Sequence, residues 1–164
     1  MTGAYRWRVK EHGAPGSVVK EAFDPAAPRP GWVRVALHAM ALNHLDLFVL
    51  AGLPGVQIVP PWVMGADAVG VIDGTDDLVL VNPGVGDGTC EYCRRGEQSL
   101  CVRFALLGEH RPGTLAEYIV VPERNVARIP RETPIDTAAA FTLATLTAWR
   151  MVVTKGAVRP GEHV

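Results

Sequence analysis

The residues most able to do chemistry form a cysteine cluster with the pattern D-x2-C-x2-C-x7-C, made by Asp87, Cys90, Cys93 and Cys101. These are the protein's only three cysteines, and three thiols cannot pair as disulfides without leaving one over. Three thiolates and one carboxylate are, however, a complete ligand set for a tetrahedral Zn²⁺ ion. We therefore predict a closed zinc site that stabilises the fold and takes no part in catalysis.

Other interpretations of the cluster remain open. Cys90 and Cys93 form a C-x2-C pair of the redox type, but no βαβ pattern surrounds them and Cys101 would have no role. A disulfide is a second alternative, although the odd number of cysteines argues against a secreted disulfide framework. For Asp87 the alternative is a solvated turn residue in a glycine-rich loop.

Composition limits the class of protein. The chain has 164 residues, of which 48% are hydrophobic and 20% charged, and its formal net charge is −1, as in ordinary globular domains. Lysines and arginines are scattered, so we expect no nucleic-acid partner. No apolar segment reaches the length of a membrane span, and the N-terminus lacks the apolar core of a signal peptide. We expect a cytoplasmic protein without a membrane partner.

The elements that must position the cluster are mostly short strands up to Pro130. Hydrophobic residues alternate along several segments that are bounded by turn residues, which favours a barrel or a sandwich. We expect strands at Tyr5–Lys10, Trp32–Met40, Trp62–Ile72, Leu78–Val81, Leu115–Val121 and Val126–Ile129.

Two helices are also predicted. The first follows Asn43, which suits an N-cap, and it stops at Gly52. The second begins after a capping Thr133, places Pro134 at its first position, and runs without interruption to Lys155. The change of composition near Pro130 predicts a domain boundary there.

Together with the cysteine cluster, four further segments resemble the medium-chain dehydrogenase/reductase family, which contains the zinc alcohol dehydrogenases and the quinone oxidoreductases. They are Ala41–Leu47, Met64–Gly70, Gly113–Pro122 and Ala140–Trp149. The resemblance implies a mainly β fold with a few helices. Residues 1–130 would form a GroES-like β-barrel as the catalytic domain, with a structural zinc lobe at about residues 84–104. Residues 131–164 would be a helical lead-in to a cofactor-binding Rossmann domain that the sequence lacks.

The sequence departs from the family where family members bind a catalytic zinc. The family's first ligand, a Cys, corresponds to Asn43, its Gly-His-Glu motif to Gly65, Ala66 and Asp67, and its third ligand to Leu143. Ala66 and Leu143 offer no zinc ligand, and a neutral Asn amide is a poor one. The resemblance therefore implies a structural zinc but no catalytic zinc.

Losing this Lewis acid changes the expected chemistry. Interconversion of an alcohol and a ketone needs strong polarisation of the oxygen. Reduction of an enone or quinone needs less, because hydrogen-bond donors can hold the charge on the oxygen. We therefore expect an NAD(P)H-dependent reductase of carbonyl, enone or quinone substrates, with Asn43, Asp46 and Asp67 as candidate catalytic residues. By resemblance, Thr147 would contact the nicotinamide. The alternative is that Asn43 and Asp46 only cap a helix.

The sequence ends at Arg159–Val164, a segment that in the family leads into the first strand of a Rossmann domain. The given sequence contains no G-x-G-x-x-G fingerprint. The segment most similar to one, Gly84–Thr89, has Thr89 where the last glycine is required. We therefore expect that this chain alone neither binds NAD(P)H nor catalyses, and that the exposed apolar helix favours a homo-oligomer. The alternative is a complete, zinc-stabilised GroES-like binding or scaffold module.

Overall fold

The fold is mainly β with a few helices, as predicted. The computed structural model describes residues 3–13 and 15–163, so the expectations that concern residues 1, 2 and 164 lie outside the described residues. The strands are β1 (Ala4–Val9), β2 (Val18–Phe23), β3 (Trp32–Ala41), β4 (Asp67–Ile72), β5 (Leu78–Val81), β6 (Gly84–Val85), β7 (Ala105–Leu106), β8 (Tyr118–Pro122) and β9 (Val126–Arg128). The helices are α1 (His44–Ala51), α2 (Glu91–Arg94), α3 (Ile135–Ala139) and α4 (Thr142–Trp149), which the π-helical segment Arg150–Lys155 continues.

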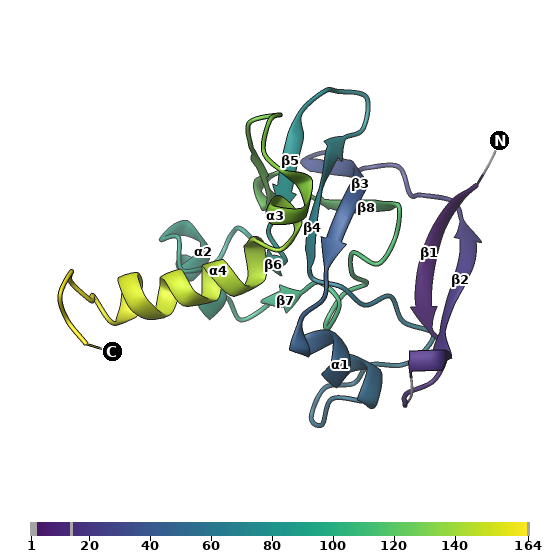
Figure 1. Cartoon of the computed structure of the whole chain (residues 1–164), viewed down its shortest axis with the longest axis horizontal. Helices are drawn as coiled ribbons and strands as arrows, with labels where there is room; N and C mark the ends of the chain where they lie inside the picture. The colour runs from purple at the N-terminus through teal and green to yellow at the C-terminus, as the bar shows by residue number, and fades with distance from the viewer. Residues whose placement is uncertain (1–2, 14, 164) are drawn as a thin grey trace.

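The core is an antiparallel sheet. Within the described residues, five strands pair in the order β8-β3-β4-β5-β9. The β1–β2 hairpin is linked to the segments that precede β8 and β4 by bridges from Arg6 to Ala116 and from Val9 to Trp62. The sheet curls into a half-barrel around a core that contains the fully buried Val35 (Figure 1).

The sheet departs from the predicted strands in two places. Residues 62–66 do not extend β4: Trp62 bonds to Val9, and residues 63–65 bond crosswise to residues 113–115, as from Leu115 N to Met64 O at 2.9 Å. At Gly65, φ is +97° and an added Cβ would lie 2.5 Å from Oγ1 of Thr114, so only glycine fits this crossing. Strand β2 was not predicted, because its alternation at Val18–Phe23 is short and interrupted by charges.

The prediction of one uninterrupted helix from Pro134 to Lys155 is wrong, because the structure has two helices in this segment. Helix α3 ends at Ala139, and α4 begins at Thr142. The carboxylate of Asp67 lies at this break, where it accepts hydrogen bonds from the Thr142 hydroxyl and from Leu143 N, the latter at 2.6 Å. A carboxylate that satisfies free N–H groups stabilises a helix start. Pro134 also serves as the N-cap of α3, and not as its first residue.

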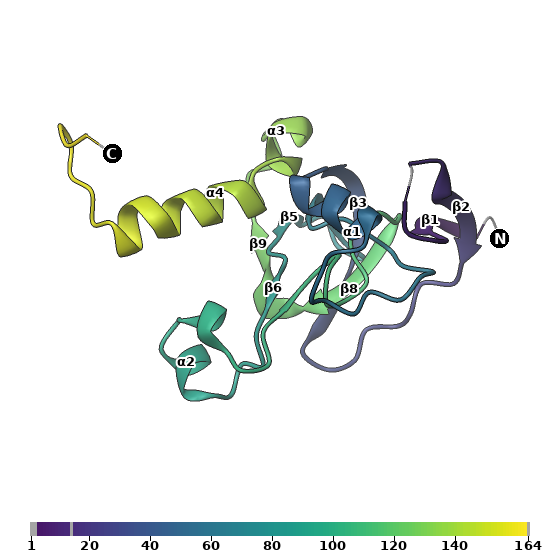
Figure 2. The same ribbon diagram turned by 90° about the horizontal axis from the view of Figure 1, so that it is seen from below.

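The predicted zinc lobe is a distinct projection from the sheet (Figure 2). Strands β6 and β7 pair at its base, Gly84 with Leu106 and Val85 with Ala105, and so close the loop close to the predicted boundaries. Helix α4 projects beyond the sheet in both views (Figures 1 and 2). Among the described residues, no helix has the length and apolar character needed to cross a membrane.

Candidate metal centre and active-site region

The structure brings the four predicted zinc ligands together at the lobe. One ligand atom from each of Asp87, Cys90, Cys93 and Cys101 lies within 4.8 Å of every other. Around a tetrahedral zinc ion with bonds of about 2.3 Å, the ligand atoms lie about 3.8 Å from one another. The distances between the four ligand atoms therefore need to shorten by at most about 1 Å for the ion to bind. The three cysteines are free thiols, and no disulfide joins them.

Backbone N–H groups point at the sulfur atoms. Asp87 N and Arg103 N each lie 3.4 Å from the Sγ atom of Cys101, and Cys93 N lies 3.4 Å from the Sγ atom of Cys90. The bond from Asp87 N is the main cause that lowers the pKa of Cys101. Desolvation raises the pKa of Cys93 to about 11, so a cation is needed to hold that sulfur as a thiolate near neutral pH. This donor set fits Zn²⁺.

Asp87 is both directed into the cluster and held there. Its Oδ1 atom accepts from Thr89 N at 2.7 Å and from Cys90 N at 2.9 Å, and its Oδ2 atom accepts from Arg103 at 2.8 Å. The bond from Cys90 N, followed by that from Thr89 N, lowers the pKa of this carboxyl. Because its side chain is only 10% exposed, Asp87 is not the solvated turn residue of the alternative interpretation. It stays the predicted fourth ligand.

The predicted active-site residues form a second network beneath the start of α4. Asn43 is the N-cap of α1, as predicted, and its Nδ2 atom donates to Oδ2 of Asp67 at 3.0 Å. Asp67 is 1% exposed and uses its other oxygen to bind Thr142 and Leu143. The contact with Thr142 was not predicted, because it joins residues 75 positions apart.

Asp46 fixes the other side of this network. Its Oδ2 atom accepts from Asn43 N, and its Oδ1 atom accepts from Gly65 N, both at 2.8 Å. Burial raises the pKa of Asp46, and the nearby charge of Asp67 adds to the effect. The two buried carboxylates thus orient α1, Gly65 and α4, and direct contact of either with substrate stays a prediction.

This network does not fit a zinc ion. Among residues 3–13 and 15–163, the lobe cluster is the only group of three or more His, Cys, Asp or Glu side chains placed to hold a metal. Ala66 and Leu143, which stand at the positions of two of the family's zinc ligands, carry no metal-binding atom in their side chains. The absence of a catalytic zinc stays a prediction.

Thr147 lies one turn beyond Leu143 on α4. Its hydroxyl donates to the Leu143 carbonyl at 2.8 Å. Both residues line a cavity of about 410 Å³ between α4 and the base of the lobe, which Phe104 and Leu106 also line. The cavity thus adjoins the Asp67 network through Leu143, and it is large enough for a small ring.

Comparison with known proteins supports the same assignment of fold. Residues 29–131 match the alcohol dehydrogenase GroES-like domain. The chain is 39% identical over 161 residues to the NAD-dependent alcohol dehydrogenase of Saccharolobus solfataricus, covering 88% of this chain and 46% of that protein. A crystal structure of an NAD-dependent alcohol dehydrogenase is 43% identical and superposes with a TM-score of 0.90 over 96% of this chain and 49% of that one.

A cobalt- and zinc-bound thermostable alcohol dehydrogenase from Pyrobaculum aerophilum is 25% identical, with a TM-score of 0.82 over 97% of this chain and 49% of that one. The chain spans about half the length of these relatives. The GroES-like resemblance is confirmed by the family match, which covers more than half of the chain. The chain therefore belongs to the zinc-type alcohol dehydrogenases of the medium-chain dehydrogenase/reductase family and carries their N-terminal GroES-like domain.

Proposed function

We propose that this chain is the substrate-binding part of an NAD(P)H-dependent reductase of enones or quinones, with one structural zinc and no catalytic zinc. The observation that carries the proposal is the network of Asn43, Asp67, Thr142 and Leu143. Its hydrogen bonds lie at the position that corresponds to the catalytic zinc site of other family members. The oxidoreductase family itself is established by the relatives.

Asn43 is the proposed donor to the substrate oxygen. An amide nitrogen carries two hydrogens, and Asp67 accepts one of them, which fixes the amide plane and leaves the second hydrogen to donate. Such a donor is suited to an enolate or quinol oxygen, because the charge on that oxygen is already spread by conjugation. Asp46 and Asp67 stay candidate catalytic residues in this proposal, and they also position Asn43 and the helix starts through the hydrogen bonds that they accept.

The cofactors follow from the same proposal. Zinc bound at the lobe would hold the chain between β6 and β7 and supply folding energy. The zinc and cobalt of the Pyrobaculum relative and the cofactor named for the NAD-dependent relatives support the assignment of Zn²⁺ and NAD(P)H. We propose that the nicotinamide lies against Thr147, and that the chain alone shows no saturable NADPH binding. Micromolar binding of NADPH by this chain would contradict the second point.

Two further properties belong to the proposal. Reduced thiolates suit a cytoplasmic location. Self-association is consistent with the exposed apolar side chains of Leu146, Trp149 and Met151 on α4 and the segment after it.

The function is tested in a chimera, in which this chain replaces the matching half of the Saccharolobus relative. The assay follows oxidation of NADH and NADPH with 2-cyclohexenone, 1,4-benzoquinone and cyclohexanone as substrates. We expect faster reduction of the first two, without any effect of added zinc on the rate. Asn43→Ala should lower kcat with the enone by roughly 10- to 100-fold, at unchanged zinc content. Preference for cyclohexanone, with a rate that rises on adding zinc, would contradict the proposal.

A further inference from the structure

A basic cavity lies where the zinc lobe meets the sheet. It has a volume of about 230 Å³, and its charged lining consists of four arginines and a single carboxylate, that of Asp87. The arginines come from four separate parts of the chain: Arg29, Arg103, Arg111 and Arg124. Apart from Asp87, this lining is distinct from the residues of the metal cluster and of the Asp67 network.

Among the described residues, two of these arginines have polar partners and two have none. Arg103 pairs with Asp87 at 2.8 Å, and Arg124 donates to the carbonyl of Gly86 at 2.6 Å. The guanidinium carbons of Arg29 and Arg111 lie 4.1 and 5.3 Å from the ring centre of Trp32. In the part of the chain that the structure describes, neither of these two guanidinium groups forms an ion pair or a hydrogen bond.

The metal cluster does not balance this charge. Zn²⁺ with three thiolates and the carboxylate of Asp87 carries a net charge of about −2, whereas four guanidinium groups carry about +4. An excess of about two positive charges therefore remains in the cavity. Guanidinium groups that line one cavity repel each other, and a bound anion reduces this repulsion.

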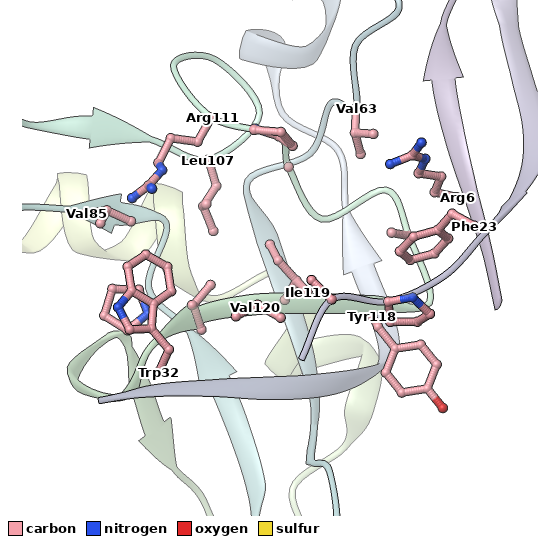
Figure 3. Close-up of a pocket in the computed structure, with 17 residues that line it drawn as sticks. Arg6, Phe23, Trp32, Val63, Val85, Leu107, Arg111, Tyr118, Ile119 and Val120 are labelled. Atoms are coloured by element: carbon pink, nitrogen blue, oxygen red, sulfur yellow. The ribbon is translucent and has the colours of Figure 1, made fainter. Parts of the chain in front are cut away.

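An apolar cavity of about 310 Å³ adjoins the basic one, since Trp32, Val85 and Arg111 line both. Figure 3 shows Trp32, Val85 and Arg111 together at one end of it. Apolar side chains line the space beyond them, including those of Leu107 and Ile119.

The far end of the apolar cavity also carries an arginine, but this one is paired. Arg6 lies there beside Phe23 (Figure 3), and it binds Glu21 at 2.6 Å, a carboxylate that it shares with Arg8. The arginines of the cavities that have no ion-pair partner among the described residues are therefore Arg29 and Arg111, at the other end. A molecule that fills both cavities needs an anionic group at that end and an apolar body at the other.

We propose that the two cavities together bind a small organic phosphate with an apolar body. The planar guanidinium groups of Arg29 and Arg111 can each donate two parallel hydrogen bonds to phosphate oxygens. A phosphate monoester dianion also balances the two excess positive charges. The apolar body lies over Trp32 toward Leu107 and Ile119.

The test uses the zinc-loaded chain in calorimetric titrations at constant ionic strength, with inorganic phosphate and hexyl phosphate as probes. We expect both to bind, with hexyl phosphate at least about tenfold tighter, because its chain buries apolar surface. Arg111→Gln and Arg29→Gln should each weaken both probes at least about tenfold at unchanged zinc content. Arg131→Gln is the matched control, because Arg131 pairs with the exposed Asp76 outside either cavity, and its affinities should equal those of the unmodified chain.

Three results would overturn the proposal. The first is hexyl phosphate binding no tighter than inorganic phosphate. The second is undiminished binding of the probes by Arg111→Gln. The third is loss of zinc from Arg111→Gln while the unmodified chain binds neither probe, since the arginines would then only balance the charge of the metal cluster.

Discussion

At the scale of single residues, Asp67 connects the parts of the candidate active-site region through its hydrogen bonds. Its two oxygens hold the amide of Asn43 on one side and the start of α4 on the other. The sequence shows an acid at this position but cannot show its partners, because Thr142 lies 75 residues away. The clustering of Asp87 with the three cysteines could be predicted because their spacing in the sequence is local.

Asp67→Asn should destabilise the fold. An amide replaces one acceptor oxygen with an N–H₂ group, which must face either the Asn43 amide or the donors of Thr142 and Leu143. We expect a loss of about 1–3 kcal/mol in the free energy of unfolding, measured with urea. Asp76→Asn, at a surface position that is 86% exposed, is the control and should change little. Equal effects of the two substitutions would contradict the role given to Asp67.

Asp46 gives the fold a pH dependence of definite sign. Burial raises its pKa above the ordinary value of 3.8, so the folded chain binds this proton more tightly than the unfolded chain. Its contribution to stability is therefore most favourable below pH 3.8 and falls as the pH rises through the raised pKa. As the pH rises through this raised pKa, the free energy of unfolding of Asp46→Asn should increase relative to that of the unmodified chain. A difference in urea unfolding that is constant with pH would refute this assignment.

At the scale of elements, the backbone crossing at Gly65 shows what sequence patterns miss. The run from Trp62 to Ile72 is apolar enough for one strand, yet its first residues bond to the segment around Thr114 instead. The break between α3 and α4 is similar, because it depends on the carboxylate of Asp67, which is distant in sequence. Helix α1 could be predicted because its signals, Asn43 and Gly52, are local.

Gly65→Ala should be much more destabilising than Gly55→Ala. Both glycines have positive φ, +97° and +82°, so both substitutions incur a backbone cost. An added Cβ at Gly65 also meets Oγ1 of Thr114 at 2.5 Å, whereas nothing lies within 4 Å of one at Gly55. We expect a difference of at least about 1 kcal/mol in thermal or urea unfolding. Equal losses would show that the crossing tolerates a side chain.

An ion pair links the zinc lobe to the end of α4. Arg150 approaches Glu97 to 2.5 Å, and this contact lowers the pKa of Glu97 below its ordinary value of 4.5. The pair therefore contributes stability above pH 4.5 that is lost as the pH falls through the lowered pKa.

The link between the lobe and α4 can be tested by an NMR titration of the Glu97 carboxyl carbon. In Arg150→Gln, the titration midpoint of Glu97 should move up toward 4.5, whereas in Arg131→Gln it should stay where it is. An unchanged midpoint in Arg150→Gln would mean that the lobe and α4 are not coupled in solution.

At the scale of the whole molecule, the chain is a curled sheet with two projections, the metal lobe and α4. The fold class could be predicted because the strands are short and separated by turns, and because the motifs resemble one family in order. The curling could not, since it depends on crosswise pairing between distant segments. The two metal positions belong together in this proposal: the lobe holds a zinc ion, and the candidate active-site region holds none.

The measurement that tests this claim most directly is the zinc content per chain by elemental analysis, after purification without added metal. We expect one zinc ion per chain, which is lost in Cys90→Ser, bound more weakly in Asp87→Asn, and fully retained in Asp67→Asn. Two zinc ions per chain, or loss of zinc in Asp67→Asn, would mean that the active-site region binds metal. A chain without zinc would contradict the assignment of the cysteine cluster.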